Sequence, residues 1–153
     1  MVFRGFLEGS NDLKIITDQR SDKINHLTTS SDAEIAWYFT KTREQFRFSG
    51  QIKLVTAASP PSRLNRARQQ TWQALSDEAR AQFLWPQPGD RRSENLADFQ
   101  PTAVNNQEPV SNFVLLLFQV TKVDHLELRG NPQNRFLYDL TADGTWQQKT
   151  VNP

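Results

Sequence analysis

The chain has 153 residues, with 18 lysines and arginines against 17 aspartates and glutamates, so its formal net charge is +1. This length predicts a single domain over residues 1–153, and the small net charge gives no sequence-wide field for nucleic acid or a membrane surface. The absence of cysteine, with only His26 and His125 as histidines, excludes disulfides, thiolate chemistry and a His-rich metal cluster. We therefore expect a cytoplasmic protein without a metal.

The N-terminal residues predict a β-hairpin. Residues 2–7 and 13–17 favour β-structure, and the intervening residues 8–12 are dense in turn formers. The first strand follows Met1 without a turn or polar leader, so we expect that N-terminal sequence is missing. Arg4 lies between Phe3 and Phe6, in a strand so apolar that its cation needs either an anionic ligand or a structural carboxylate partner.

The segment 20–23 places two cations at the start of a predicted helix. Ser21 is the expected N-cap of a helix through residue 27, and Arg20 and Lys23 flank it. The helix macrodipole is already positive there, so these cations conflict with it. A phosphate bound by the exposed amides, the Ser21 hydroxyl and both cations would resolve the conflict. The alternative is a surface helix start with solvated charges.

Two further strands follow at residues 34–39 and 45–55, joined by a short polar connection. Gln45 and Arg47 share the polar face of the second strand. They either contact a ligand or form the hydrated side of the sheet.

The rest of the chain predicts two short helices, a long loop and more strands. Helical spacing begins at Leu64 and again after Ser76, residues 86–109 show no period, and strands are expected at 112–120, 125–128, 136–140 and 146–151. Arg135 precedes the third of these strands, where it either reaches across an interface or occupies a strand edge. Seven or eight closely spaced strands with one helical insert predict a mainly β fold, a small antiparallel β-barrel.

Read together, several segments resemble the pyridoxamine 5'-phosphate oxidase superfamily, and more closely its oxidase-related FMN-binding branch of cyanobacteria and plants. The segments that carry this resemblance are Val2-Phe3-Arg4-Gly5-Phe6, Ile16-Thr17-Asp18-Gln19-Arg20-Ser21-Asp22-Lys23, Trp37-Tyr38-Phe39, Arg43-Glu44-Gln45-Phe46-Arg47, Val123-Asp124-His125-Leu126-Glu127-Leu128-Arg129-Gly130, Asn134-Arg135-Phe136-Leu137-Tyr138 and Val151-Asn152-Pro153. Each is weak alone, but their order and spacing are specific.

The resemblance implies an FMN-binding split β-barrel that forms a homodimer, with FMN between the subunits. It implies that Arg4, Ile16 and Thr17 lie beside the flavin and that Lys23 binds its phosphate, helped by Arg20 or Ser21 because Asp22 stands where the family has an arginine. It also implies that Gln45 and Arg135 contact the flavin. The family's N-terminal helix and first strand would lie upstream of Met1.

The same resemblance exposes a departure at the substrate position. In the true oxidases an Arg-x-His element holds pyridoxal phosphate, whereas this chain has Asn131-Pro132-Gln133. We therefore expect an FMN-dependent oxidoreductase with a different, unidentified substrate. The alternatives are a flavin-binding module or carrier without turnover, and a truncated product that binds nothing.

Overall fold

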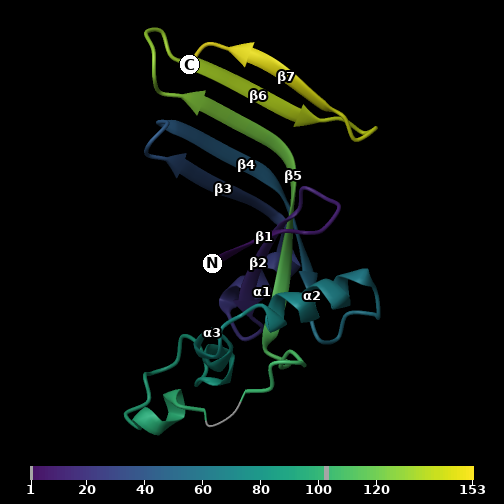
Figure 1. The fold of residues 1–153 in the computed structure, drawn as a ribbon, viewed down its shortest axis with the longest axis vertical. Helices are drawn as coiled ribbons and strands as arrows, with labels where there is room; N and C mark the ends of the chain where they lie inside the picture. The colour runs from purple at the N-terminus through teal and green to yellow at the C-terminus, as the bar shows by residue number, and fades with distance from the viewer. Residues whose placement is uncertain (1, 102–103) are drawn as a thin grey trace. The chain divides into compact units, whose positions relative to one another are not determined.

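The computed structural model describes residues 2–101 and 104–153. Contacts between residues divide the chain into two compact units. The helical unit comprises Met1–Ser30 and Lys53–Leu117, and the strand unit comprises Ser31–Ile52 and Phe118–Pro153. Two long strands, β4 (Glu44–Val55) and β5 (Phe113–Glu127), contribute residues to both units (Figure 1).

The described residues form a mainly β structure, as the sequence predicted. Seven strands join one sheet in the order β1-β2-β5-β4-β3, and β6 pairs with both β5 and β7. The pairs β1–β2, β3–β4, β5–β6 and β6–β7 are all antiparallel. The two expected N-terminal and central hairpins are thus confirmed.

The helical unit contains every helix that the structure describes. Its elements are β1 (Val2–Phe6), β2 (Leu13–Asp18), α1 (Asp22–Thr29), α2 (Arg63–Gln73), α3 (Asp77–Ala81) and the short 3₁₀ helices η1 (Gln82–Leu84) and η2 (Leu96–Phe99). The predicted helix starts at Ser21 and Ser76 are confirmed as N-caps. None of these helices is long and apolar enough to span a bilayer.

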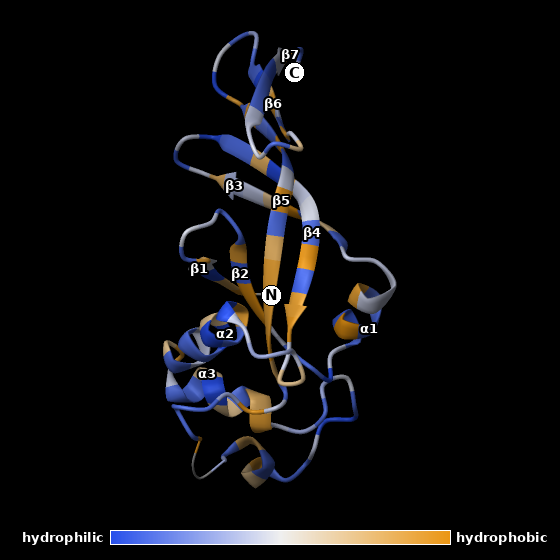
Figure 2. Ribbon diagram, turned by 90° about the vertical axis from the view of Figure 1, so that its right-hand side faces the viewer, coloured by the Kyte–Doolittle hydropathy of each residue, from blue (hydrophilic) through white to orange (hydrophobic). Residues whose placement is uncertain are grey.

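The core of the helical unit is built around the first part of β5, where every residue from Phe113 to Phe118 is buried. Hydrophobic residues follow this stretch of β5 and the end of β4 (Figure 2). The rings of Trp72, Phe83 and Phe113 pack edge to face, with centroids 5.1–5.8 Å apart. Arg68 lies against this core, and its guanidinium donates to the carbonyl oxygens of Phe113 and Val110 at 2.9 and 2.8 Å.

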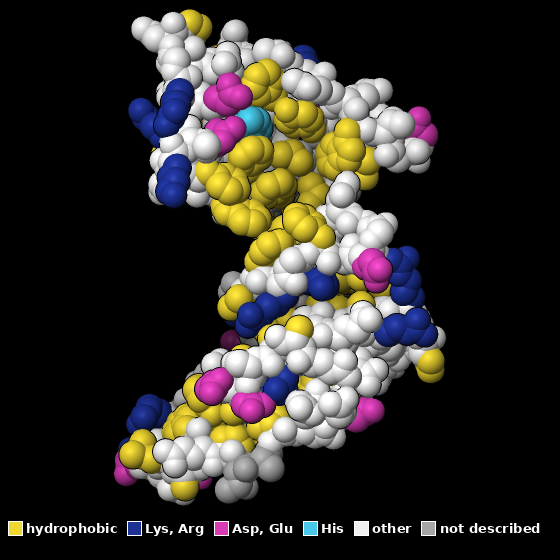
Figure 3. All heavy atoms as spheres, viewed as in Figure 1, with side chains coloured by type: hydrophobic (Ala, Val, Ile, Leu, Met, Phe, Trp, Pro, Cys, Tyr) yellow, Lys and Arg dark blue, Asp and Glu magenta, His cyan; other side chains and the backbone are white. Residues whose placement is uncertain are grey.

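The strand unit consists of β3 (Asp32–Phe39), parts of β4 and β5, β6 (Asn134–Leu140) and β7 (Trp146–Val151). Aromatic residues alternate along β3 and β4 and form a continuous ring cluster on one face. Its members are Trp37, Phe39, Phe46 and Phe48, with neighbouring centroids 5.5–6.5 Å apart. Figure 3 shows hydrophobic side chains gathered over the strands of this unit.

Two sequence predictions need correction. The strands expected at 112–120 and 125–128 are one continuous strand, because the residues between them stay extended and Lys122, Val123 and Asp124 pair with β6. The loop expected at 86–109 contains η2, whose N-cap is the Asn95 side chain, while residues 102 and 103 of this loop lie outside the described residues. Side chains of α2 anchor the loop further on, since Trp72 Nε1 donates to the Asn105 carbonyl at 2.9 Å.

The pairing of β4 with β5 in the strand unit depends on a glycine. A Cβ atom added to Gly50 would lie 2.0 Å from the Gln119 carbonyl oxygen, and this neighbour is backbone that no side-chain rotation can clear. We predict that Gly50→Ala lowers the free energy of unfolding by about 3 kcal/mol, because the two strands must separate. Urea denaturation measures this change.

Ser49→Ala is the matched control, because it also introduces an alanine, at the position next to Gly50. Ser49 is half-buried, and its hydroxyl makes one 3.3 Å hydrogen bond to Glu34. Its effect should stay within about 0.5 kcal/mol. Equal stability of the two variants would contradict the steric account.

Candidate functional site

The strongest candidate site is a cavity of about 380 Å³ in the helical unit, which we call the hairpin cavity. One side comes from the β1–β2 hairpin and the other from α3, η1 and the residues just after η1. The lining residues are Val2, Arg4, Ile16, Thr17, Asp18, Ala79, Gln82, Phe83, Trp85 and Pro88. A cavity of this size, with an apolar wall and a few polar groups, is typical of a small-molecule site.

Three residues singled out from the sequence, Arg4, Ile16 and Thr17, meet in the hairpin cavity. Arg4 is exposed, and its guanidinium has no ion pair or hydrogen bond to any described residue. The structural carboxylate that the sequence offered as an alternative partner is therefore absent among the described residues. A positive charge facing a cavity without a protein counter-ion is available to an anionic ligand.

Arg20 has a different set of partners from those the sequence implied. Its guanidinium pairs with both carboxylate oxygens of Asp18, at 2.9 and 2.8 Å, which raises the pKa of Arg20. The same group donates to the carbonyl oxygens of Trp85 at 2.9 Å and Phe83 at 3.3 Å. Arg20 thus connects the two sides of the hairpin cavity, and we call this set of contacts the Arg20 clamp.

Ser21 and Lys23 lie at the start of α1, directly beyond the clamp. The Ser21 amide donates to the Asp18 carbonyl at 3.1 Å, which attaches the helix start to a residue of the cavity wall. Ser21 is the N-cap of α1, but its hydroxyl caps no backbone amide. The exposed Lys23 ammonium lies 3.5 Å from this hydroxyl. The Ile24 amide donates to the Ser21 carbonyl at 2.9 Å, whereas the amides of Asp22 and Lys23 have no acceptor among the described residues. Donors of three kinds, hydroxyl, ammonium and amide, are therefore present at this helix start.

Gln45 and Arg135 belong to the strand unit. Gln45 is half-buried on β4 opposite Tyr38, and its side-chain amide has no hydrogen-bond partner among the described residues. Arg135 on β6 makes a two-pronged ion pair with Asp124, at 3.0 and 2.7 Å. These hydrogen bonds lower the pKa of Asp124 below its usual range. The pair fixes the orientation of the guanidinium and leaves part of it exposed.

His125, to which the sequence assigned no role, is held in the aromatic cluster. Its ring stacks on Phe46 at 4.1 Å, and its Nε2 lies 3.2 Å from Glu44 Oε1. Hydrogen bonds from Thr42 and then from His125 lower the pKa of Glu44. Glu127 brings a third potential ligand atom within 4.8 Å, and Asn134 donates to it at 2.9 Å. Within the described part of the chain, these contacts account for the cluster as a structural network.

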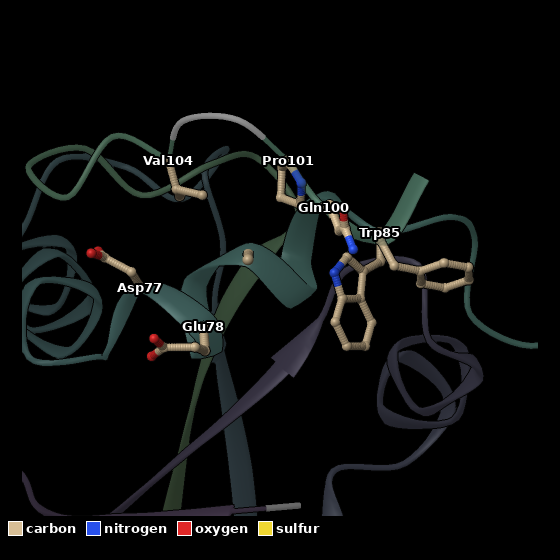
Figure 4. Close-up of a pocket in the computed structure, with 8 residues that line it drawn as sticks. Asp77, Glu78, Trp85, Gln100, Pro101 and Val104 are labelled. Atoms are coloured by element: carbon tan, nitrogen blue, oxygen red, sulfur yellow. The ribbon is translucent and has the colours of Figure 1, made fainter. Parts of the chain in front are cut away.

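A second cavity, of about 570 Å³, shares the lining residue Trp85 with the hairpin cavity. Figure 4 shows that the carboxylates of Asp77 and Glu78 point away from the indole. The buried indole Nε1 has no hydrogen-bond partner among the described residues. None of the residues singled out from the sequence lines this second cavity, so the hairpin cavity is the better candidate.

Sequence reasoning missed the wall formed by Ala79, Gln82, Phe83, Trp85 and Pro88. One signal was present, because Phe83-Leu84-Trp85 is a short apolar run between a polar helix and a polar loop. Sequence spacing alone does not reveal that this run lines a cavity with β1 and β2, or that its carbonyl groups accept hydrogen bonds from Arg20, 63 and 65 residues earlier in the chain.

Known proteins resemble this chain over nearly its whole length. The family model described as pyridoxamine 5'-phosphate oxidase, FMN-binding domain, matches residues 1–56. The chain is 36% identical to pyridoxine/pyridoxamine 5'-phosphate oxidase 2 of Arabidopsis thaliana over 157 residues, which cover 100% of this chain and 78% of the relative.

Two solved structures have a similar fold. A pyridoxamine 5'-phosphate oxidase-related, FMN-binding protein of Nostoc punctiforme is 48% identical, with a TM-score of 0.95 over 99% of this chain and 78% of that one. PhzG from Burkholderia lata, solved in complex with tetrahydrophenazine-1-carboxylic acid, is 16% identical, with a TM-score of 0.76 over 99% of this chain and 72% of that one. The second likeness concerns the fold alone.

The Arg20 clamp generates a prediction about the cavity wall. Arg20→Lys keeps the charge but cannot span Asp18 and two carbonyl groups at once, so it should lower the free energy of unfolding by about 2 kcal/mol. Amide hydrogen exchange at residues 82–88 should accelerate, because this segment loses its anchor to the hairpin.

Arg91→Lys is the control, since Arg91 is exposed and pairs only with the equally exposed Glu94 at 3.0 Å. It should change neither stability nor exchange. Unchanged exchange at 82–88 in Arg20→Lys would show that the clamp does not hold the wall.

Proposed function

We propose that this chain, which belongs to the FMN-binding pyridoxamine 5'-phosphate oxidase family, is an FMN-dependent oxidoreductase that works as a homodimer. Family membership confirms the resemblance that the sequence indicated, and it makes FMN the cofactor. The observation that carries the proposal is the hairpin cavity, where Arg4, Ile16 and Thr17 meet beside the start of α1.

The donors at the start of α1 fit the phosphate group of FMN. The Ser21 hydroxyl, the Lys23 ammonium and the first amides of the helix are all hydrogen-bond donors, and no carboxylate of the described residues is paired with Lys23. A dianion bound there gains charge-assisted hydrogen bonds and a favourable interaction with the helix macrodipole. Since the guanidinium of Arg20 is used in the clamp, we assign the direct phosphate contacts to Ser21 and Lys23 and an indirect role to Arg20.

The cavity itself suits the flavin side of the cofactor. Ile16 provides an apolar surface, the Thr17 hydroxyl is a donor or acceptor, and Arg4 provides an unpaired positive charge. Bound FMN supplies the redox chemistry, because its ring accepts and donates a hydride. The guanidinium of Arg4 stabilises negative charge on the flavin or on an anionic substrate held beside it.

The proposed dimer places Gln45 and Arg135 near the flavin. The family resemblance assigns them to a groove between subunits, and the surface of the strand unit supports such an association. Tyr38 is 49% exposed and Phe39 is 42% exposed, which leaves large aromatic side chains in contact with water. Tyr38 and Phe39 are consecutive in β3 and so lie on opposite faces of the sheet, and no helix of the strand unit covers either face. Exposed aromatic surface of this kind is typical of an interface.

The substrate differs from that named for the Arabidopsis relative. In this chain Asn131-Pro132-Gln133 occupies the positions of the Arg-x-His element that holds pyridoxal phosphate in true oxidases. Neutral side chains there provide no counter-charge for a phosphate ester. The proposal is therefore an oxidoreductase whose substrate is not held through that element.

The phosphate assignment is tested with Lys23→Ala. The purified protein should be yellow and release FMN on denaturation, and Lys23→Ala should weaken FMN binding by about 1.5–3 kcal/mol, because a charge-assisted hydrogen bond is lost. Quenching of flavin fluorescence measures the affinity. Lys53→Ala, at an exposed lysine of β4, is the control and should bind as the wild type does. Equal affinity of the two variants would remove Lys23 from the site.

Turnover separates the oxidoreductase from a flavin carrier. NADH, NADPH, pyridoxamine 5'-phosphate and pyridoxine 5'-phosphate are each mixed anaerobically with the yellow protein. Loss of the visible flavin absorption with any of them supports the enzyme. A flavin that dithionite reduces and none of these donors reduces favours the carrier. Light scattering on the same sample should give twice the chain mass of 17.6 kDa for the proposed dimer.

A further inference from the structure

The helical unit contains another cavity, of about 370 Å³, between the β1–β2 hairpin and α2. It shares no lining residue with the hairpin cavity. The hairpin contributes Phe6, Leu7, Glu8 and Lys14, and α2 contributes Arg63, Arg66, Ala67 and Gln70. We call it the basic cavity, because three of these eight side chains are cationic and one is anionic.

The positive charge of the basic cavity is not neutralised within the described part of the chain. The side chains of Lys14 and Arg66 have neither an ion pair nor a hydrogen bond to any described residue. The Arg63 guanidinium donates to the backbone carbonyl of Glu8, and so its charge is not matched by a carboxylate. Three cations face one carboxylate, that of Glu8, on this wall, and a bound anion offsets the positive charge that is left over.

The position of Arg63 and Arg66 adds to this excess. Both lie in the first turn of α2, which contains no acidic residue. The macrodipole is positive at that end, where acidic residues are stabilising and arginines are not. The excess positive charge around the cavity therefore comes from the helix side, because Lys14 and Glu8 of the hairpin have opposite charges.

The remaining wall of the basic cavity is apolar. Phe6 is 57% exposed although it is a large aromatic residue, and the adjacent Leu7 and Ala67 are buried. The Phe6 ring packs edge to face on Phe3, with centroids 5.5 Å apart, which limits its motion. An exposed ring on the same wall as these cations matches a ligand with a flat ring and a charged head group.

We propose that the basic cavity binds a small aryl phosphate, with the phosphate among Lys14, Arg63 and Arg66 and the ring against Phe6. A dianionic head group matches three cations better than a carboxylate does, and guanidinium groups bind phosphate through paired hydrogen bonds. The Gln70 amide provides a further donor at the same wall. This site is separate from the flavin site and does not depend on the proposed oxidoreductase activity.

The test uses the FMN-loaded chain and phenyl phosphate as the probe, so that the flavin phosphate site is already filled. Calorimetry should detect one saturable site per chain, with an affinity that falls as salt is added. The double variant Lys14→Glu/Arg66→Glu should bind at least about tenfold more weakly, and Phe6→Ala should weaken phenyl phosphate while leaving inorganic phosphate unchanged.

The control variant Arg91→Glu/Lys149→Glu makes the same change in net charge at two exposed positions elsewhere. It should bind phenyl phosphate as the wild type does, and all variants should retain FMN. Equal binding by the two double variants, or no saturable binding by the wild type, would overturn the proposal. Loss of probe binding in Lys23→Ala with no loss in Lys14→Glu/Arg66→Glu would place the probe at the flavin site and would also overturn it.

Discussion

The ion pair between Arg20 and Asp18 is the interaction on which the hairpin cavity depends. Asp18 ends β2, and its carboxylate orients the guanidinium that reaches the carbonyl groups of Phe83 and Trp85. The two walls of the cavity are about 65 residues apart in sequence, and this guanidinium connects them directly. The same pair reduces the electrostatic conflict at the start of α1, because one of the two cations there has its own counter-ion. Lys23 then remains as the cation available to a phosphate.

Two groups of cations in the helical unit have different surroundings. Arg68 and Arg80 are buried and donate mainly to backbone carbonyl oxygens. Burial lowers the pKa of Arg68, but its hydrogen bonds to residues 110 and 113 fix the segment that leads into β5. The side chains of Arg4, Lys14 and Arg66 instead face cavities and have no ion pair or hydrogen bond among the described residues. A buried cation with carbonyl acceptors serves the fold, whereas an unpaired cation on a cavity wall is suited to a ligand.

Local patterns predicted the elements of this fold well, because alternation, turn formers and N-caps act over a few residues. The hairpins, Ser21 and Ser76 followed directly from such patterns. The continuity of β5 was missed, since the polar residues Thr121, Lys122 and Asp124 interrupt its apolar pattern, and the pairing of Lys122 and Asp124 with β6 is not visible in the sequence. The cavity wall at 79–88 and the hydrogen bonds of Arg20 to the carbonyl groups of Phe83 and Trp85 were missed for the same reason. These contacts join distant segments, and a single sequence contains no local signal for them.

Arg4 and Arg135 differ in how strongly each can attract an anionic substrate. Arg135 is already paired with Asp124, so its net contribution to binding an anion is reduced by a neighbouring carboxylate. Arg4 has no such partner and lies in the hairpin cavity with Thr17. If the substrate is anionic, its charged group therefore gains most by approaching Arg4. A cation on the substrate would be repelled by Arg4, and Asp18, the carboxylate on that cavity wall, is already engaged by Arg20. The charges of the cavity thus favour neutral or anionic substrates, and they do so without the Arg-x-His element that this chain lacks.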